Sequence, residues 1–285
     1  WKRIRASLGR RGVALNKCPG VRPIGIGELE QRLEAKVMAD NTGMEAQEAC
    51  GVDNLCVGLK AGIEGGVHSM RDILQDEDTE GGLLVDAFNA FNSMIREAAL
   101  WNCRILWPSC SRFLFNTYIG YARIFMKGSK EILLSREGTT QGDPLAMIMY
   151  GVGMIPLTRE LFEILIAAIQ IWYADDSGCA GKIIELRKWF DALIEKGKYG
   201  YFPEPSKCVL IIKEGLEELA NQYFGDLGVR IVYASRYLGG FVGKEDEVRE
   251  FVKSKIDVWK KCIGMMAKAA VKYPQAASGA FTRSL

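Results

Sequence analysis

Histidine is nearly absent from this chain of 285 residues, because His68 is the only one. A zinc site that needs two histidines is therefore excluded, and Ser-His-Asp or Cys-His catalysis would have to pass through this single imidazole. The cysteines are irregularly spaced and form no CxxC pair, so small disulfide loops are not indicated. Carboxylate chemistry is the class that remains. We expect a reducing, intracellular compartment, either cytoplasmic or nuclear.

A hydrophobic run long enough to cross a bilayer is also missing. The longest apolar stretch, 144–157, is shorter than a membrane span, and the next, 161–172, contains Glu163 and Gln170. No membrane partner is therefore expected. The first residue is Trp1, and no basic-then-apolar leader follows it. We expect the chain to be part of a longer protein whose flanking domains are missing.

Apolar residues make up 48% of the chain, and the net charge is only +2. This composition is ample for one large core or for two to three subdomains. The charges are unevenly distributed. Basic residues without acids occupy 1–11, lysines dominate 253–285, and acids gather between Asp76 and Glu80. Both basic segments suit phosphate binding, although a solvated surface explains either segment equally well.

Local patterns predict an α+β chain. Residues 83–85 form a short apolar run that reads as a buried strand ending at Asp86. Further strands are expected at 122–125, 131–134, 171–174, 177–180, 209–212 and 230–233. Helices are expected from Asn92 or Ser93 to Leu106 before Pro108, from Pro144 with an interruption near Pro156, over 183–196, and over 248–266 with lysines opposite an apolar face. Residues 1–80 mix short helical patterns with glycine-rich turns, and regular structure is hard to place there.

Three carboxylates lie at predicted strand ends. Asp86 follows one strand, and Asp175 with Asp176 occupies the tip of a predicted hairpin. Phosphoryl transfer at a nucleic-acid 3′ end uses two divalent cations about 3.5 to 4 Å apart. Magnesium prefers hard oxygen ligands, so aspartates on adjacent strands would suit such a pair. Taken alone, an Asp-Asp turn or an aspartate after a strand is more often turn or capping chemistry.

Short motifs occur in the order that is known from one enzyme family. They read LLVDAFNAFN at 83–92, QGDPL at 141–145, YADD at 173–176, PSK at 205–207 and YLGG at 237–240, with RPI upstream at 22–24. These segments resemble motifs A to E and the fingers motif of reverse transcriptases. The combination covers most of the chain and is far more specific than any part of it. The YADD and QGDPL segments are most similar to those of non-LTR retrotransposon and group II intron enzymes.

The resemblance implies a right-hand polymerase fold with a ferredoxin-like palm. Fingers are expected at 1–82 with part of 104–140, the palm at 83–243, and the start of a helical thumb at 244–285. The implied reaction is RNA-templated DNA synthesis, in which a primer 3′-hydroxyl attacks a dNTP and pyrophosphate leaves. The expected partners are an RNA template, a DNA or RNA primer, dNTPs and two Mg²⁺ ions, for which Mn²⁺ can substitute.

The resemblance also assigns catalytic roles. Asp86 and Asp175 would bind both metal ions, with Asp176 completing the acidic site. Lys207 would stabilise or protonate the leaving pyrophosphate, although an ordinary charge at a strand edge also explains it. The primer grip would consist of Leu238, Gly239 and Gly240, for which a plain β-turn is the alternative.

The substrate-binding residues follow from the same resemblance. Arg22 would pair with triphosphate oxygens, and a surface arginine is the alternative. Phe91 stands where the family keeps an aromatic steric gate against the ribose 2′-hydroxyl, and the alternative is a core phenylalanine. Gln141 and Gly142 would line the nucleotide pocket, where glycine allows close backbone approach. A loop that leads into a helix is compatible with both readings.

Two other functions stay open. An RNA-dependent RNA polymerase shares the palm geometry, although the aromatic Phe91 and the YADD segment argue against it. A decayed or domesticated element that only binds nucleic acid is the other. The intact carboxylates speak against decay, but the few residues after the YLGG segment indicate an incomplete thumb. No second acidic cluster resembles an RNase H or endonuclease site.

Overall fold

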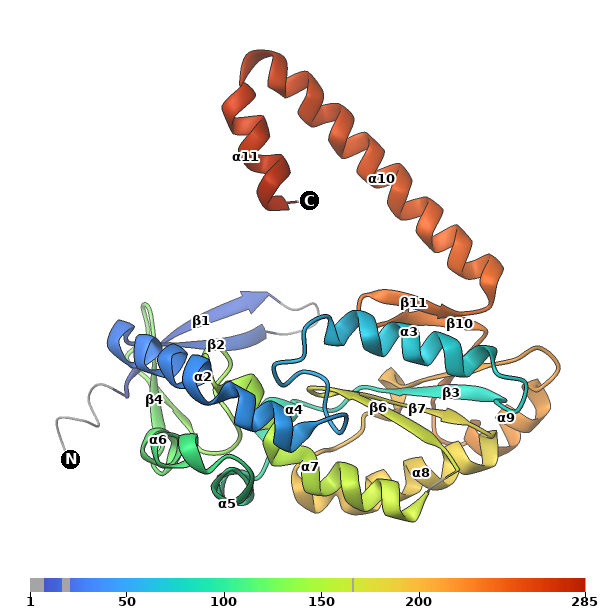
Figure 1. Ribbon diagram of the computed structural model, residues 1–285, viewed down its shortest axis with the longest axis horizontal. Coiled ribbons are helices and arrows are strands. Elements are labelled where there is room, and N and C mark those ends of the chain that lie inside the picture. Colours follow the sequence, from blue (N-terminus) through green and yellow to red (C-terminus); the bar gives the residue numbers. More distant parts are fainter. Residues whose placement is uncertain (1–7, 17–20, 166, 285) are drawn as a thin grey trace.

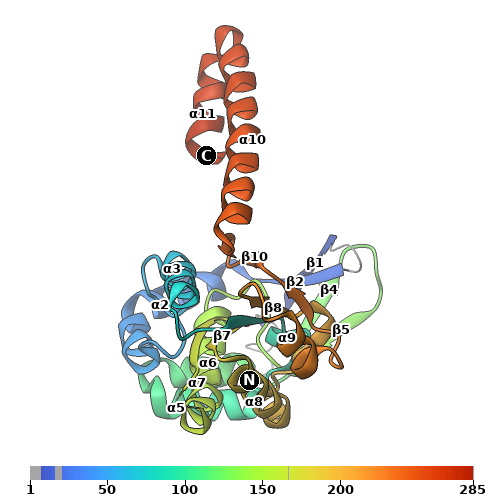
Figure 2. The same ribbon diagram turned by 90° about the vertical axis from the view of Figure 1, so that its right-hand side faces the viewer.

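The computed structural model describes residues 8–16, 21–165 and 167–284 (Figure 1). Within these ranges the strands form a five-stranded sheet, a four-stranded sheet and a two-stranded hairpin. A helical arm leaves the body of the molecule at its C-terminal end (Figure 2). The chain is therefore α+β, as the sequence predicts.

The central sheet has a ferredoxin-like topology. From edge to edge it contains β6 (Ile169–Tyr173), β7 (Asp176–Gly181), β3 (Gly81–Val85), β8 (Val209–Ile212) and β9 (Arg230–Val232). The first four are antiparallel neighbours, and β9 runs parallel to β8. In chain order, β3 is followed by helices and a hairpin of another sheet (122–135), then by the β6–β7 hairpin, another helix and β8. The strands predicted in this part of the chain are confirmed to within one or two residues.

Helices cover both faces of this sheet. They are α3 (Gly62–Gln75) on one side, and α7 (Ala146–Ile164) and α8 (Ile183–Glu195) on the other (Figure 1). Every residue of β3 and of β8 is buried. A sheet covered on both faces needs strands that are continuously apolar rather than alternating, which explains why these two strands read as short hydrophobic runs.

The helix expected from residue 92 or 93 begins later. A one-turn helix, α4 (Ala90–Ser93), comes first, and α5 (Arg96–Leu106) begins after a break. The break lies at Met94 and Ile95, whose extended backbone (ψ of 132° and 105°) ends α4 and precedes α5. Pro108 does more than end this helix. It is the first residue of α6 (Pro108–Tyr118), a position where the missing N–H costs nothing.

The predicted interruption near Pro156 is wrong, because α7 continues through it. A proline inside a helix costs about 3 kcal/mol, and burial offsets this cost. Most of α7 is buried, and the Asn102 side chain donates to the Gly153 carbonyl at 3.1 Å. The helix also begins at Ala146 rather than at Pro144, with Asp143 Oδ1 accepting the Leu145 N–H at 3.0 Å.

The four-stranded sheet joins distant parts of the chain. Its order is β2 (Val21–Gly27), β1 (Arg10–Asn16), β4 (Ala122–Met126) and β5 (Ile132–Ser135). The predicted β4–β5 hairpin is confirmed, and β1 pairs with β4 in parallel. The region before residue 80, where regular structure was hard to place, also holds α2 (Leu29–Cys50). This long helix has few buried residues, so its sequence lacks a clear apolar stripe.

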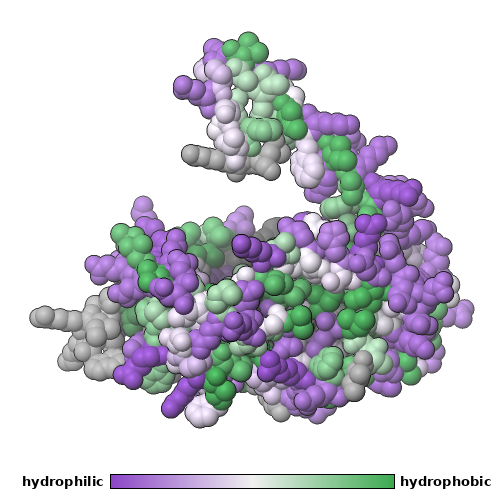
Figure 3. All heavy atoms as spheres, viewed as in Figure 1, coloured by the Kyte–Doolittle hydropathy of each residue, from purple (hydrophilic) through white to green (hydrophobic). Residues whose placement is uncertain are grey.

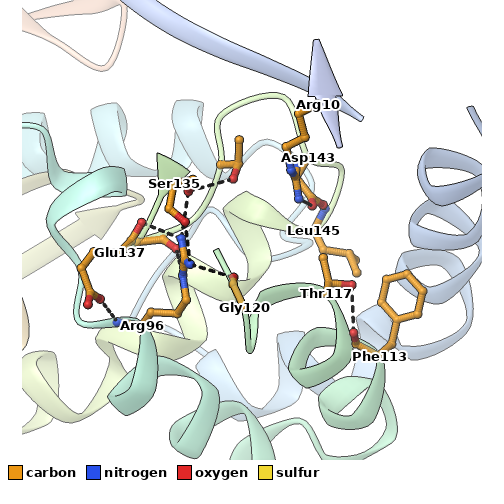
Figure 4. A network of polar contacts seen from close by, with 11 residues as sticks. Arg10, Arg96, Phe113, Thr117, Gly120, Ser135, Glu137, Asp143 and Leu145 are labelled. Carbon is orange, nitrogen blue, oxygen red and sulfur yellow. Dashed lines mark hydrogen bonds and ion pairs between the residues drawn. The ribbon is translucent and has the colours of Figure 1, made fainter. Parts of the chain in front are cut away.

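Two buried arginines fix the loop before α7 (Figure 4). Arg10 of β1 forms a salt bridge with Asp143 at 2.8 Å, and both side chains are almost fully buried. Arg96 donates to the carbonyls of Gly138 at 2.9 Å and Glu137 at 2.8 Å. These contacts hold the four-stranded sheet against the segment 135–145.

The C-terminal part forms a hairpin and an arm. The hairpin is β10 (Ala234–Tyr237) with β11 (Gly240–Gly243), and the arm is α10 (Glu245–Lys272) with α11 (Pro274–Ser284). Three short helices precede them: η1 (Lys196–Tyr199), η2 (Pro205–Lys207) and α9 (Glu217–Phe224). The predicted amphipathic helix corresponds to α10, which has no buried residue. Hydrophobic side chains run along it between hydrophilic ones (Figure 3). In the described ranges, no helix is long and apolar enough to cross a membrane.

Candidate active site

The sheet register brings the three predicted carboxylates to one end of two neighbouring strands. Val85 of β3 pairs with Ser177 of β7 in an antiparallel register. Continuing this register by one residue places Asp86 opposite Asp176. Asp175 precedes Asp176 in the turn between β6 and β7, where Tyr173 pairs with Asp176. Asp86 and Asp176, ninety positions apart in sequence, therefore face one another because of the ferredoxin-like strand order.

Negative charge accumulates at this strand end. Partial burial, together with repulsion from the carboxylates of Asp175 and Asp86, raises the pKa of Asp176 to about 6. The Asp176 side chain is nevertheless exposed at the surface, as is Asp86, while Asp175 is half-buried. The site is therefore an open acidic face. Such a site gains from bound cations, because they remove the repulsion between like charges.

Asn54 shapes the turn that carries the acid pair. Ala174 has a left-handed φ of 54°, a conformation that costs energy for a residue with a Cβ. Asn54 is 1% exposed; its Oδ1 accepts the Ala174 N–H at 3.0 Å, and its Nδ2 donates to the Ala174 carbonyl at 3.4 Å. The sequence analysis missed Asn54, since no local pattern marks a residue whose partner is so distant.

Tyr201 forms hydrogen bonds to the same turn from the protein interior. Its hydroxyl donates to the Asp175 carbonyl at 2.8 Å and lies 2.9 Å from the Ser177 hydroxyl. The ring packs edge-on against Trp172, with centroids 5.2 Å apart. Tyr201 is fully buried, so these contacts hold the Asp175 carbonyl and the Ser177 side chain, one on each side of Asp176. It too was missed by the sequence analysis.

Lys207 lies near Asp86 because the chain pairs back on itself. Glu204 N–H donates to the Asp86 carbonyl at 2.9 Å, and Phe88 N–H donates to the Phe202 carbonyl at 2.8 Å. Lys207 is exposed and forms an ion pair with Glu204. This hydrogen-bonded pair raises the pKa of Lys207, and the charge of Asp86 contributes to the rise. The lysine thus carries its proton beside the acidic face.

Phe91 stands against a buried tyrosine. Its half-buried ring stacks on Tyr150, with centroids 4.5 Å apart and planes at 29°. The Phe91 carbonyl accepts the Thr139 N–H at 2.7 Å. The Tyr150 hydroxyl has no hydrogen-bond partner in the part of the chain that the structure describes. Burial raises the pKa of Tyr150, as do Tyr201 and Asp175, so this phenol is neutral.

The predicted nucleotide-pocket loop rests on β2. The Gln141 carbonyl accepts the Gly25 N–H at 2.8 Å. Gly142 has a φ of 104°, and a Cβ there would lie 2.9 Å from the Gly25 carbonyl oxygen. Glycine is therefore required at 142 for both conformation and space. Arg22 lies in the same strand, paired with Leu15, and its side chain is outside what the structure describes.

Comparison with known proteins shows similarity in fold alone. No protein-family model matches the chain, and no curated protein matches it in sequence. Among solved structures, apo telomerase from Candida tropicalis matches with a TM-score of 0.62 and 11% identity over 83% of this chain and 47% of that chain. Telomerase from Candida albicans in complex with a fragment of telomeric RNA matches with a TM-score of 0.61 and 10% identity, over 86% of this chain and 46% of that one. The chain thus spans about half the length of these telomerases. It has the right-hand polymerase fold.

In this right-hand polymerase fold the predicted primer-grip residues form a tight hairpin turn. Leu238 and Gly239 have left-handed φ values of 47° and 85° between β10 and β11. The hairpin packs closely on α3, because a Cβ on Gly240 would lie 2.7 Å from the Val67 side chain. Burial raises the pKa of Tyr237, and the charge of Asp176 adds to it. The β10–β11 hairpin is therefore close enough to the acidic face for the charge of Asp176 to act on the Tyr237 hydroxyl.

The basic N-terminal segment is only partly available to phosphates. Arg10 is buried and neutralised by Asp143, so its expected exposure is wrong, whereas Arg11 is exposed. Lys2, Arg3 and Arg5 lie outside the described residues. The α10 lysines are exposed as expected. His68, which has no assigned role, is also exposed.

The donor set at the strand end fits a hard divalent cation. Three carboxylates, one half-buried and two exposed, provide only oxygen ligands. Partial burial raises the pKa of Asp176, and repulsion from Asp175 and Asp86 adds to the rise. In the described ranges, no group of three or more histidine, cysteine, aspartate or glutamate side chains is already arranged to hold a metal ion. The backbone brings the ligands to one place, and their convergence on a cation requires side-chain rotation.

Proposed function

We propose that the chain performs RNA-templated DNA synthesis by two-metal nucleotidyl transfer. The observation that supports this most strongly is the register of β3 and β7, which sets Asp86 opposite Asp176 beside Asp175. In a right-hand polymerase fold this strand end is where nucleotidyl transfer would need carboxylates. The order of the motifs along the chain supports a reverse transcriptase, of the retrotransposon or group II intron type.

The acidic face would hold two Mg²⁺ ions, or Mn²⁺ in their place. When bound, these ions would lower the pKa of the primer 3′-hydroxyl and neutralise charge on the phosphates. Asp86 and Asp175 would bind both ions, and Asp176 would complete the set. Asn54 and Tyr201 hold the backbone of the turn, so convergence of the carboxylates on the ions would need rotation of their side chains but no change of the turn.

Lys207 would act at the leaving group. Its ammonium is kept protonated by Glu204 and lies in the field of Asp86. An ammonium at this place would balance charge on the departing pyrophosphate or give it a proton. The Glu204 ion pair would have to open for this contact, which is cheap for exposed side chains.

Substrate choice would rest on Phe91, Gln141 and Gly142. The Phe91 ring is backed by Tyr150, so it would not yield to a ribose 2′-hydroxyl, and dNTPs would be preferred over rNTPs. Gly142 keeps the loop backbone close to β2, the strand that also carries Arg22. The triphosphate would lie against this loop and strand together, since the two are in direct contact.

The subdomains follow the sheets. The four-stranded sheet with α2 would form the fingers within 1–82 and part of 104–140, and the central sheet would form the palm within 83–243. The arm at 244–285 would begin the thumb. Leu238, Gly239 and Gly240 would hold the primer backbone between palm and arm. An RNA template and a DNA or RNA primer would be bound mainly through their phosphates.

The test is primer extension on an RNA template with dNTPs and Mg²⁺. We expect extension by the native chain, loss by a chelator, and a decrease of at least about a thousandfold in Asp175→Asn. Asp40→Asn, an exposed aspartate of α2, is the matched control and should retain activity. Equal extension by the native chain and Asp175→Asn would refute the catalytic assignment.

The same assay separates the alternatives. Incorporation of rNTPs as readily as dNTPs would identify an RNA-dependent RNA polymerase. Persistent binding of primer-template with no extension in Mg²⁺ or Mn²⁺ would identify a nucleic-acid-binding protein that has lost synthesis.

A further inference from the structure

A second concave surface lies between α5 and α6, beside the ends of β4 and β5. Its cavity has a volume of about 750 Å³. The lining combines aromatic rings with arginines: Trp101, Phe115, Tyr121, Arg104, Arg112 and Arg136. We call these six residues the arginine-aromatic groove. None of them belongs to the candidate active site.

Helical spacing creates the groove. Trp101 and Arg104 are three residues apart on α5, and Arg112 and Phe115 are three apart on α6. Residues at this spacing share a helix face, so each helix presents one ring and one guanidinium to the same hollow. The helices are joined only through Trp107, which is fully buried, so the two faces are held at a fixed angle.

The three rings are exposed, and two of them have an arginine over one face. Trp101 is 60% exposed, Phe115 45% and Tyr121 63%. The Arg104 guanidinium lies 5.8 Å from the centre of the Trp101 ring, and that of Arg136 lies 5.5 Å from the centre of the Tyr121 ring. Single exposed aromatic residues are common on protein surfaces. Three in one hollow, interleaved with cations, are not explained by packing within the chain.

The lining of the groove carries an excess of positive charge, with four arginines against two glutamates. Two glutamates also line the cavity, and one of them, Glu137, already accepts the Arg96 N–H at 3.0 Å. Across the ranges that the structure describes, none of Arg104, Arg112 and Arg136 forms a salt bridge. Their charges are therefore available to an anionic ligand.

We propose that the arginine-aromatic groove binds single-stranded RNA. Unpaired bases would stack on Trp101, Phe115 and Tyr121, and the arginines would bind the phosphates between them. A duplex is excluded because its bases are already stacked on one another and cannot enter a hollow between two helices. The helices α5 and α6, which line the groove, lie on the side of the molecule away from α10 (Figure 1, Figure 2). The groove would hold template outside the catalytic face, and this binding does not depend on synthesis.

Fluorescence anisotropy with a short fluorescein-labelled oligouridine tests the ring contribution. We expect the double variant Trp101→Ala with Phe115→Ala to bind at least about tenfold more weakly. Phe162→Ala removes an aromatic ring of α7 that is 57% exposed and should leave the affinity unchanged. Unchanged affinity in the double variant, with the native melting temperature retained, would overturn the proposal.

The salt dependence of the oligouridine affinity measures the contribution of the arginines. Replacing Arg104, Arg112 and Arg136 by glutamine should reduce the slope of log affinity against log salt concentration by about 2. Arg230→Gln, at the exposed edge strand β9, should reduce it by less than about 1. An equal small effect of both changes would contradict the phosphate contacts.

Two further measurements separate this site from other surfaces. Oligouridine containing 4-thiouridine should crosslink to the segment 96–136, and crosslinks confined to other segments would refute the groove. Asp175→Asn should keep the oligouridine affinity, so loss of synthesis and loss of this site are distinguishable. If the ring variants change the oligomeric state in light scattering and not RNA binding, the groove is a protein interface and the proposal fails.

Discussion

Asn54 and Ala174 are joined by two hydrogen bonds, although the residues are 120 positions apart in the chain. The amide of one buried side chain thus satisfies both backbone groups of a residue in the left-handed region. The turn that carries Asp175 is therefore shaped by a loop that belongs to neither strand of its hairpin. This relationship predicts that the acidic site depends on a residue that never contacts substrate.

Asn54→Ala should weaken both the fold and synthesis. It removes the two hydrogen bonds to Ala174 and a third from the Cys56 N–H at 3.3 Å. Backbone groups of Ala174 are then buried without partners, which costs about 1–3 kcal/mol of unfolding free energy. A small displacement of Asp175 should lower primer extension at least about tenfold. Denaturant unfolding and extension rates measure the two effects. Asn221→Ala, whose side chain bonds to the exposed Glu217 carbonyl, is the control. Full extension by a folded Asn54→Ala chain would contradict the positioning role.

The raised pKa of Asp176 should make the stability of the fold depend on pH. The pKa is raised from an ordinary value of 3.8 to about 6, so the folded chain binds this proton more tightly than the unfolded chain. Ionisation therefore destabilises the fold fully above pH 6, and the penalty disappears below about pH 4. Asp176→Asn should raise the melting temperature by roughly 1–3 °C at neutral pH without metal, and leave it unchanged near pH 4.

Magnesium should reverse this advantage. Cations bound at the acidic face stabilise the native chain in proportion to their occupancy, and Asp176→Asn offers one ligand fewer. Calorimetry with and without Mg²⁺ measures the difference, with Asp40→Asn as the control for charge. A stability gain in Asp176→Asn that is the same at neutral and acidic pH would show that repulsion among the carboxylates is not its cause.

Any side chain at position 142 should destabilise the fold. The Gly142 φ of 104° and the 2.9 Å approach to the Gly25 carbonyl oxygen mean that Gly142→Ala should lose about 1–3 kcal/mol of stability. Displacement of the loop should also raise the KM for dNTP. Gly43→Ala, a position in α2 with nothing within 4 Å of the added Cβ, should be neutral or stabilising by about 0.5–1 kcal/mol. Equal unfolding midpoints for the two variants would disprove the strain at 142.

Local pattern was sufficient to predict parts of the fold whose cause is local. The run before Asp86 and the alternation around Asp175 predict strands because burial and turn chemistry act over a few residues. Asn54, Tyr201 and the continuation of α7 through Pro156 were beyond such patterns, since each depends on contacts between distant segments. The long polar helix α2 was missed for the same reason, because it is held by neighbours rather than by an apolar stripe.

The role of the Arg10 charge could not be predicted from local sequence either. A basic residue in a basic segment predicts a phosphate contact, yet Arg10 lies in a buried salt bridge with Asp143, 133 positions away. The QGDPL segment therefore contains a residue with a structural task, which is to tie β1 to the start of α7.

The Arg10–Asp143 pair should behave as a buried ion pair in a double-mutant cycle. Removal of one partner leaves the other charge buried and unpaired, so Arg10→Met or Asp143→Leu alone should cost about 3–5 kcal/mol of unfolding free energy. The double variant should be much less destabilised than the sum, because no unpaired charge remains. The exposed pair Arg249–Glu245 is the matched control and should contribute less than about 1 kcal/mol. Additive losses in the buried pair would show that each residue acts through separate contacts, and the tie between β1 and the loop before α7 would then not be electrostatic.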